Sequence, residues 1–261
     1  MRRINHDVRR ILLALLLITI AACETVPVTG RSQLLLVSEA EETKMGIDAY
    51  QGILNKSKVS SDPRLNEQVT RVGKRIAEAT GRNDYQWEFK VLEDTQANAF
   101  CLPGGKVAVY TGILPITRDD AGLAAVLGHE VSHAIARHGG ERMSQTILVQ
   151  SGLAATQTAL AGNDPVVVQS VTALLGAGAS VGLLLPWSRS QESEADHLGL
   201  IYMAKAGYNP IAARDLWVRM GDASRNSAAP PAFLSTHPSA ATRVTQIEGW
   251  MPEALQYYRP R

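Results

Sequence analysis

The spacing of apolar and polar residues predicts a chain built mainly of helices. A Ser-x-x-Glu capping box predicts a helix over residues 38–51, and an Asp-Pro pair at 62–63 predicts the start of a second one. The apolar residues of this second helix recur on one face: Leu65, Val69, Val72 and Ile76. A third helix, buried on nearly all sides, is expected to be capped by a Thr-x-x-Asp box at 117–120 and ended by the Gly-Gly pair at 139–140.

A small sheet is predicted between the second and third helices. Trp87, Phe89 and Val91 recur at every second position, which is typical of a strand with one buried face. Two further apolar runs, 98–102 and 107–110, flank Pro-Gly-Gly and predict a hairpin. The expected fold class is therefore α+β, a mostly helical domain with a small antiparallel sheet beside the buried helix.

The buried helix carries the sequence V-L-G-H-E-V-S-H-A-I-A-R-H over residues 126–138. His129 and His133 are four residues apart on one face, so they can share one metal ion with Glu130 beside them. Zinc prefers such nitrogen ligands and acidifies a water molecule that Glu130 can deprotonate, which predicts peptide hydrolysis. The alternative is a core helix whose histidines are paired with carboxylates. His138 does not fit as a third ligand and is expected beside a ligand or at the end of the helix.

A second polar cluster, Q-E-S-E-A-D-H at residues 191–197, supplies the carboxylates that the zinc site lacks. Glu192 and Asp196 are four residues apart on one helical face. Glu192 is therefore predicted to be the third zinc ligand, and Asp196 to hydrogen-bond a ligand histidine. Glu194 lies about 160° to 200° around the helix and is expected to face solvent. His197 is also expected to face away from the site.

The first residues predict a secretion signal. Four arginines precede an apolar run at 11–18 that is too short to span a bilayer, and the segment ends in Ile-Ala-Ala-Cys. This ending resembles a bacterial lipobox, in which Cys23 is lipidated and becomes the first mature residue. The alternative is an ordinary signal peptide with an incidental cysteine. Glu24 is not the aspartate that retains lipoproteins in the inner membrane, so the periplasmic face of the outer membrane is the expected location.

These features divide the chain into a lipoprotein signal peptide at 1–22, a lipidated tether at 23–37 and one catalytic domain at 38–261. Residues 166–185 contain no charged side chain. One interpretation is a transmembrane helix. A chain that is already held by a lipid has no need to span the membrane, however, so this segment is expected to fold onto the catalytic domain.

Charge and cysteine content exclude some classes of protein. The chain has 26 basic and 25 acidic residues, and removal of residues 1–22 takes away four arginines and Asp7, which leaves a net charge of −2. No nucleic-acid partner is expected from this balance. Once Cys23 is lipidated, Cys101 has no cysteine to pair with, so no intramolecular disulfide is expected. The 45% hydrophobic content is enough for one core.

The motifs H-E-V-S-H and E-S-E-A-D resemble those of the gluzincin zinc metallopeptidases of the HtpX and CAAX prenyl protease family, particularly its periplasmic lipoprotein members. The likeness runs from P-V-T-G-R near residue 28 through N-A-F-C-L-P-G-G-K-V-A-V-Y-T-G to S-T-H-P-S near the C-terminus. It implies a zincin-like metallopeptidase domain with one Zn²⁺ at His129, His133 and Glu192. It also implies that Glu130 is the base and that Asp196 supports a ligand.

The resemblance also implies that His237, in the sequence S-T-H-P, approaches the metal. His237 would be a fourth ligand in a resting enzyme or a donor to the oxyanion, and the alternative is a helix N-cap. Arg243 follows at the family's spacing and is assigned to substrate binding. In zinc peptidases an edge strand beside the metal can pair with an extended substrate, and Asn98, Ala99 and Phe100 are predicted to form it. The alternative is an internal strand without a ligand.

The predicted function is that of a zinc endopeptidase of the bacterial cell envelope that hydrolyses misfolded or unassembled outer-membrane proteins. Its expected partners are protein or peptide substrates, the membrane through the lipid on Cys23, and the outer-membrane assembly machinery. One alternative is a chaperone or binding module that keeps the peptidase fold with catalysis suppressed. Another is a structural lipoprotein without stoichiometric metal.

Overall fold

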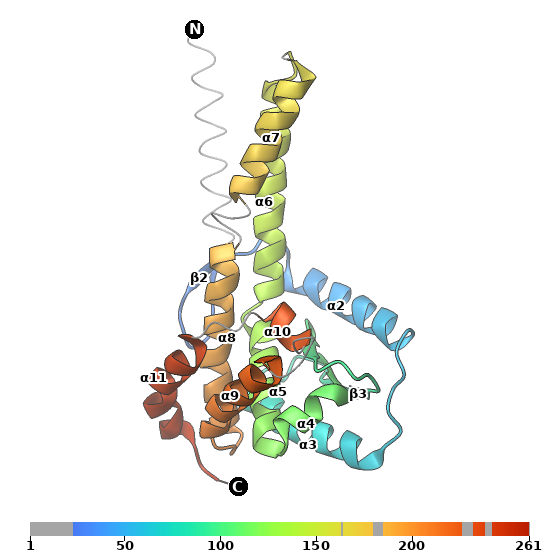
Figure 1. Ribbon diagram of the computed structural model, residues 1–261, viewed down its shortest axis with the longest axis vertical. Coiled ribbons are helices and arrows are strands. Elements are labelled where there is room, and N and C mark those ends of the chain that lie inside the picture. Colours follow the sequence, from blue (N-terminus) through green and yellow to red (C-terminus); the bar gives the residue numbers. More distant parts are fainter. Residues whose placement is uncertain (1–22, 163, 180–184, 226–231, 238–241, 261) are drawn as a thin grey trace.

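The computed structural model describes residues 23–162, 164–179, 185–225, 232–237 and 242–260, and the predicted signal peptide lies outside them. Helices dominate this part of the chain, which also holds a three-stranded and a two-stranded sheet (Figure 1). In chain order the elements are β1 (Cys23–Thr25), β2 (Ser32–Leu34), α2 (Glu39–Leu54), α3 (Pro63–Thr80), β3 (Glu88–Leu92), β4 (Ala99–Leu102), β5 (Lys106–Tyr110), the 3-10 turn η1 (Thr111–Ile113), α4 (Leu114–Thr117), α5 (Asp120–Ile135), α6 (His138–Ala159), α7 (Pro165–Ala179), α8 (Leu185–Lys205), α9 (Ile211–Arg225), α10 (Ala232–Thr236) and α11 (Thr242–Tyr257).

The two helices predicted from their capping signals are present. Ser38 closes a capping box with Glu41 at the start of α2, and the Asp62 side chain accepts a hydrogen bond from the backbone N–H of Arg64 at the start of α3. In α3, Val69 and Ile76 are among the buried residues of the predicted apolar face. Local side-chain chemistry therefore decided where these helices begin, as the sequence indicated.

The sheet has the strand order β3-β5-β4. Strands β4 and β5 form the predicted hairpin around Pro-Gly-Gly, where Gly104 and Gly105 both adopt a φ of +82°. Strand β3 runs parallel to β5, so the sheet is mixed rather than wholly antiparallel. The reason is that β5 takes the central position, which the alternation pattern of single strands cannot specify. Strand β4 is left at one edge of this sheet, as predicted.

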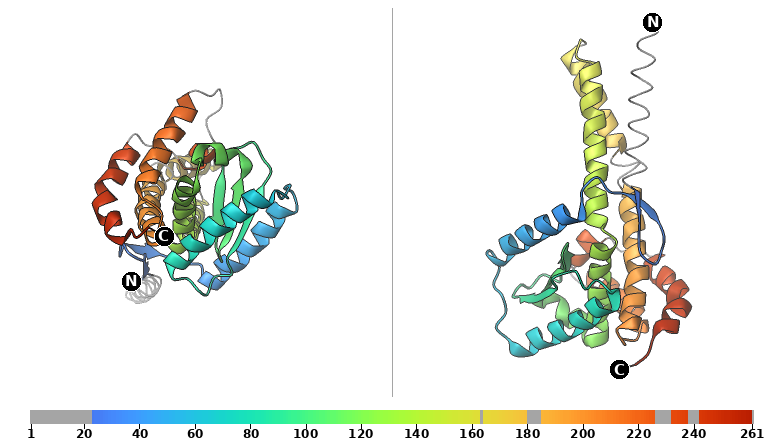
Figure 2. Two further views of the ribbon diagram at one scale, coloured as in Figure 1. Left: turned by 90° about the horizontal axis from the view of Figure 1, so that it is seen from below. Right: turned by 180° about the vertical axis from the view of Figure 1, so that it is seen from behind.

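Helix α5 lies at the centre of the domain, with the sheet and α3 on one side and α8 and α9 on the other (Figure 2). Its residues from Gly122 to Ile135 are all buried, as its apolar composition predicted. Its N-cap differs from the prediction. Asp119 accepts the backbone N–H of Gly122 at 2.8 Å, while Thr117 ends α4 and donates to the Leu114 carbonyl.

The end of α5 also differs from the prediction. The helix stops at Ile135 because Arg137 adopts a left-handed backbone with a φ of 54°, and α6 begins directly at His138. The glycine pair at 139–140 therefore lies in the first turn of α6 and does not end α5. Arg137 is held in this unusual conformation by hydrogen bonds to the Glu42 carboxylate and to the Val37 carbonyl at 2.9 Å.

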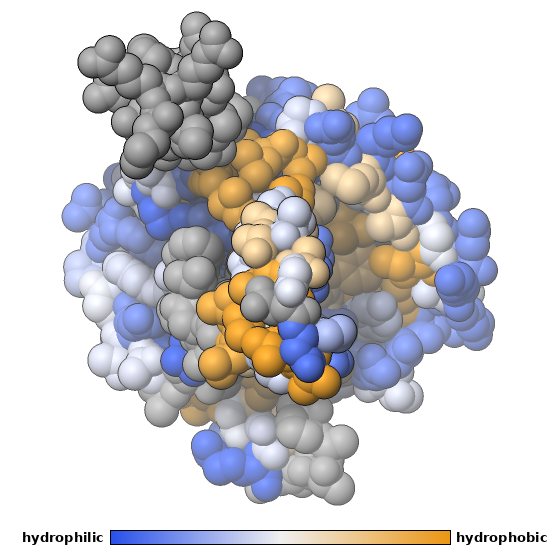
Figure 3. Space-filling view, turned by 90° about the horizontal axis from the view of Figure 1, so that it is seen from above, coloured by the Kyte–Doolittle hydropathy of each residue, from blue (hydrophilic) through white to orange (hydrophobic). Residues whose placement is uncertain are grey.

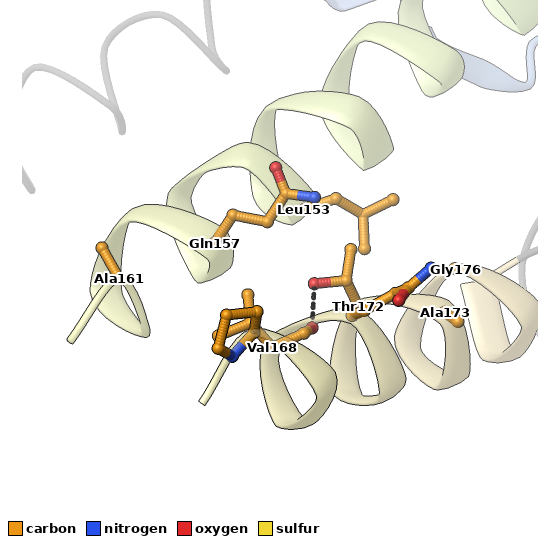
Figure 4. Close-up of a pocket in the computed structure, with 9 residues that line it drawn as sticks. Leu153, Gln157, Ala161, Val168, Thr172, Ala173 and Gly176 are labelled. Carbon is orange, nitrogen blue, oxygen red and sulfur yellow. Dashed lines mark hydrogen bonds between the residues drawn. The ribbon is translucent and has the colours of Figure 1, made fainter. Parts of the chain in front are cut away.

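Helices α6 and α7 form a hairpin that projects from the domain (Figure 1). The prediction that residues 166–185 fold onto the catalytic domain is therefore wrong for α7, which packs along α6 instead. A groove lined by Leu153, Val168 and Thr172 separates the two helices (Figure 4). Val166 and Leu174 are 68% and 75% exposed, and hydrophobic residues cover much of the hairpin end (Figure 3). Among the described residues, no helix has the length and apolar character to cross a membrane.

The segment predicted as a tether, residues 23–37, is folded. Strands β1 and β2 pair antiparallel, and Val26 and Leu35 are buried against the domain. The backbone N–H of Leu36 donates to the Ser144 hydroxyl in α6 at 2.8 Å. These apolar and polar contacts offset the entropy cost of ordering the segment. The sequence did not predict this order because few apolar residues recur at regular spacing in the segment.

Candidate metal centre

Four side chains from distant parts of the chain converge beside α5: His129 and His133 of α5, Glu192 of α8, and His237 just after α10. One potential ligand atom from each lies within 4.8 Å of the others. The Nε2 atoms of His129 and His133 are 3.1 Å apart. Oε2 of Glu192 lies 3.4 Å from Nε2 of His129, and its Oε1 atom lies 3.4 Å from Nε2 of His133. The structure thus brings together the three predicted zinc ligands, with His237 as a fourth donor.

A pair of glycines lets α5 and α8 cross closely enough to form this cluster. A Cβ atom added at Gly199 would lie 2.9 Å from the backbone nitrogen of His129, and one at Gly128 would lie 2.9 Å from the carbonyl oxygen of Gly199. Side chains at either position would hold the helices apart. The crossing places the start of the histidine motif opposite the acidic residues of α8.

Asp196 makes the contact that was predicted for it. Its Oδ1 atom lies 3.0 Å from Nδ1 of His129. The same carboxylate accepts hydrogen bonds from Nε and Nη2 of Arg243, the latter at 2.8 Å, and the guanidinium carbon of Arg243 lies 3.6 Å from the centroid of the Trp217 ring. Because a carboxylate accepts, the proton of His129 is placed on Nδ1 and its Nε2 atom is left to bind a metal.

Glu130 is buried beside the cluster and has one oxygen atom without a hydrogen bond. Its Oε1 atom has no hydrogen-bond partner among the described residues, and Nε2 of His237 lies 3.4 Å away. Burial raises the pKa of Glu130. An orphaned oxygen of this kind indicates a missing partner. Together with two imidazoles and a carboxylate at one point, it fits a zinc site that takes part in hydrolysis.

His138 contacts the second predicted ligand. Its Nδ1 atom lies 2.9 Å from Nδ1 of His133, and its Nε2 atom lies 3.0 Å from Oε2 of Glu194. His138 therefore lies beside a ligand, which was one of its two predicted places. The prediction that Glu194 faces solvent is wrong, since Glu194 is only 7% exposed. Glu194 does lie on the side of α8 opposite Glu192, as helical geometry predicted. That side is not exposed to solvent, because the start of α6 packs there.

Burial and charge set the protonation of these groups in different ways. Burial lowers the pKa of His133 well below its ordinary value, so this imidazole is neutral. Burial also lowers the pKa of His129, but hydrogen bonds to Asp196 and Glu192 prevail and raise it to about 9. Burial opposes ionisation of Glu192, yet hydrogen bonds to His129 and His237 lower its pKa. A metal that binds His129 must therefore displace a proton.

His237 lies directly after α10 and its side chain faces the cluster. Its Nδ1 atom is 2.9 Å from Oε2 of Glu192 and 3.2 Å from Nε2 of His129. Its backbone N–H donates to the Phe233 carbonyl at 2.8 Å, which fixes it to the last turn of α10. The alternative of a helix N-cap stays a prediction, since residues 238–241 lie outside the described residues.

Of the residues predicted to bind substrate, Arg243 contacts His129 of the cluster, and the other three lie at strand β4, which packs on α5. Their role stays a prediction. Asn98 precedes the edge strand β4, and Ala99 and Phe100 belong to it. Arg243 is buried against Asp196, but its Nη1 atom has no hydrogen-bond partner among the described residues. A cavity of about 150 Å³ opens beside it, with Glu192, Asp196 and Arg243 in its lining.

Two residues next to the site were missed from the sequence. Arg31 of the N-terminal segment donates from Nε to Oε2 of Glu194 at 2.9 Å and from Nη1 to Oε1 of Glu141 at 2.7 Å. Thr29 donates its hydroxyl to Oε1 of Glu194. Both belong to the P-V-T-G-R motif that carries part of the family likeness. This motif could have indicated that the two residues have a role at the site.

Comparison with known proteins gives the family. Residues 63–251 match the sequence model of peptidase family M48. Mitochondrial metalloendopeptidase OMA1 of Schizosaccharomyces pombe is 42% identical over 236 residues, which are 88% of this chain and 67% of the yeast protein. A putative beta-barrel assembly-enhancing protease of Vibrio cholerae is 31% identical over 204 residues, which are 76% of this chain and 42% of that protein.

Metalloendopeptidase OMA1 of Homo sapiens is 29% identical over 247 residues, which are 89% of this chain and 47% of the human protein. The likeness to the yeast mitochondrial protein is thus higher than that to the Vibrio protein, a relation that the sequence motifs did not predict. The family match spans both halves of the cluster, from the histidine motif in α5 to the acidic motif in α8. The chain belongs to peptidase family M48 and is a zinc metalloendopeptidase.

Proposed function

We propose that this peptidase works in the bacterial cell envelope and cleaves misfolded or unassembled outer-membrane proteins. Two observations support this setting. Relatives from Vibrio cholerae and Escherichia coli are named for enhancing β-barrel assembly, and the first residues of this chain resemble a lipoprotein signal. The outer-membrane assembly machinery is a further partner in this proposal.

The reaction assigned to the site is hydrolysis of a peptide bond, and the orphaned oxygen of Glu130 carries the proposal. His129, His133 and Glu192 would hold one zinc ion, which when bound supplies Lewis acidity toward water and the scissile carbonyl. Glu130 accepts the proton of the attacking water at Oε1, the oxygen without a hydrogen-bond partner among the described residues. Its raised pKa makes it a stronger base than an exposed glutamate.

Substrate binding is assigned to the edge strand β4 of the sheet and to Arg243. Asn98, Ala99 and Phe100 would pair with an extended segment of substrate through their backbone groups, as edge strands do in other peptide-binding proteins. A folded protein has few such segments to offer, so this mode favours unfolded substrates. The Nη1 atom of Arg243 is buried without a hydrogen-bond partner among the described residues, and we assign it to a substrate carbonyl, while Nε and Nη2 bind Asp196.

His237 is proposed to restrain the enzyme at rest. Its Nδ1 atom stands among the ligand atoms, 2.9 Å from Glu192 and 3.2 Å from Nε2 of His129. As a fourth ligand it takes the position that an attacking water needs. This geometry also favours the second candidate function, a binding or chaperone module in which catalysis is suppressed.

A lipid on Cys23 is proposed to hold the enzyme at the membrane. Glu24, the next residue, pairs with Arg137 at 2.7 Å, so the anchor would start beside the base of the α6–α7 hairpin. The hairpin exposes apolar side chains such as Val166 and Leu174. A membrane near the anchor would therefore also meet apolar side chains of the hairpin.

The experiment compares wild-type protein, loaded with one equivalent of zinc, with Glu130→Gln. Both are incubated with unfolded casein, with an unfolded outer-membrane β-barrel protein, and with the same barrel folded in detergent. Wild type should cleave both unfolded substrates and spare the folded barrel. Glu130→Gln should retain zinc and lose activity by roughly a hundredfold or more, since its amide cannot take up the proton.

Each other result has a definite meaning. If wild type binds the unfolded proteins and cleaves neither of them, the result would favour the second candidate function, a binding or chaperone module, over the peptidase. A wild type that holds no stoichiometric zinc would indicate a structural lipoprotein. Equal cleavage by Glu130→Gln would remove Glu130 as the base.

A further inference from the structure

An unbroken chain of polar contacts joins His133 to the N-terminal segment. Nδ1 of His133 lies 2.9 Å from Nδ1 of His138, and Nε2 of His138 lies 3.0 Å from Oε2 of Glu194. The same Oε2 atom accepts a hydrogen bond from Nε of Arg31 at 2.9 Å, and Oε1 accepts one from the Thr29 hydroxyl. His133, His138 and Glu194 are all buried, so water does not replace these contacts.

The donors and acceptors in this chain can be assigned from one end. Arg31 can only donate, so Oε2 of Glu194 accepts from it and from Nε2 of His138. A neutral His138 with its proton on Nε2 must accept at Nδ1. His133 must then donate from its own Nδ1 atom, which leaves a lone pair on its Nε2 atom. That atom is the one that faces the metal cluster, 3.1 Å from Nε2 of His129.

The outer end of the chain is fixed in place by the N-terminal segment. Arg31 also donates to both carboxylate oxygens of Glu141, at 2.7 and 2.9 Å, in the first turn of α6. The backbone of Leu36 is bound to Ser144 one turn later. The N-terminal segment is therefore bound to α6, the helix that begins with His138. This segment lies before residues 63–251, the part of the chain that matches the family model.

We propose that His138, Glu194 and Arg31 are positioning residues that select the tautomer and hold the ring of His133 for zinc binding. The N-terminal segment is then part of the metal centre. This inference rests on the proposed role of His133 as a zinc ligand. Partners of metal-bound histidines act in this way because the hydrogen bond at one ring nitrogen decides what the other can do.

The test uses His138→Phe and Arg31→Met in the full chain, with two readouts. The first is the zinc dissociation constant, measured by competition with a chromophoric chelator. His138→Phe should bind zinc about 10- to 100-fold more weakly, and Arg31→Met should show a smaller loss in the same direction. The second is the tautomer of His133 in the zinc-free protein, read from the ¹⁵N shifts of its ring. Wild type should carry the proton on Nδ1, and His138→Phe should lose this preference.

Matched controls separate this role from a general effect on folding. His197→Phe changes the same residue type on α8, where His197 stacks on Trp250 and bonds Glu253. Arg82→Met removes an arginine that is also partly buried and paired with two acids, Glu39 and Asp84. Both controls should keep the wild-type zinc constant and the wild-type His133 tautomer.

Unchanged zinc affinity and an unchanged tautomer in His138→Phe would overturn the proposal, as would a loss in Arg82→Met equal to that in Arg31→Met. If His138→Phe fails to fold, Arg31→Met decides on the same two readouts, since Arg31 is partly exposed. Failure of the metal site itself looks different. In that case wild type would bind no zinc, or His133→Ala would still bind zinc. The tautomer of His133 in the zinc-free protein would still test the chain of polar contacts from His133 to Arg31.

Discussion

Gly199→Ala tests whether the close crossing of α5 and α8 holds the metal-binding side chains in position. The new Cβ atom would lie 2.9 Å from the backbone nitrogen of His129 and 3.0 Å from the carbonyl carbon of Gly128. Both neighbours are backbone atoms and cannot rotate away. Ordinary contacts between such atoms lie at about 3.5 Å or more, so the helices must separate by roughly 0.6 Å.

A displacement of this size exceeds the tolerance of metal–ligand distances, but it costs a pair of packed helices only a moderate free energy. Metal–ligand distances tolerate only about 0.2 Å, so zinc affinity should fall. Overpacking costs about 1–3 kcal/mol, and the better helix propensity of alanine returns about 1 kcal/mol. The net change is a loss of up to roughly 2 kcal/mol, which lowers the melting temperature of a domain of this size by several degrees.

Gly249→Ala is the matched control, because Gly249 lies in α11 with no atom within 4 Å of an added Cβ. It should keep zinc affinity and keep or raise the melting temperature. In a thermal melt of the zinc-free protein, Gly199→Ala should therefore lower the melting temperature and Gly249→Ala should not. Chelator competition is the second assay. If Gly199→Ala matched wild type in both, the crossing would not determine the geometry of the cluster.

Four further outcomes are expected. Glu192→Ala should lose zinc on metal analysis after gel filtration, and wild-type occupancy would remove Glu192 from the ligand set. His237→Ala should keep zinc and cleave casein faster than wild type. A fall of about a hundredfold would instead assign His237 to the oxyanion, and an unchanged rate would exclude both roles. Cys23→Ser should move the mature protein from the membrane fraction to the soluble one, and continued membrane association would point to residues 166–185. Burial opposes ionisation of Glu194, but hydrogen bonds from His138, Thr29 and Arg31 prevail and lower its pKa from 4.5 to about 2. Its contribution to stability is therefore present above pH 4.5 and lost as the pH falls toward 2, a dependence that should be absent from urea unfolding of Glu194→Gln.

Features encoded by residues close in sequence were predicted well. The two histidines of the motif, and Glu192 with Asp196, share a helical face because four residues nearly complete one turn. The capping residues Ser38 and Asp62 begin α2 and α3 where expected. In these cases the partners of each residue lie within the same turn, so tertiary packing had little to change.

Features that depend on distant partners were not predictable in this way. Helical geometry placed Glu194 opposite Glu192, and only the fold shows that α6 begins on that side of α8. The parallel pairing of β3 with β5 depends on which strand takes the centre of the sheet. Arg31 was overlooked because its segment has little apolar periodicity, although ion pairs and buried residues such as Val26 order it.

The three carboxylates of α8 serve three different parts of the centre. Glu192 faces the zinc-binding atoms, Asp196 contacts His129, and Glu194 reaches His133 through His138. This division is feasible because the left-handed backbone at Arg137 separates α5 from α6, and His138 at the start of α6 lies beside His133. One helix therefore supports the outer nitrogens of both histidines of the motif. A shift of α8 disturbs both histidines at once, so substitutions at its crossing with α5 should impair zinc binding even though they remove no ligand.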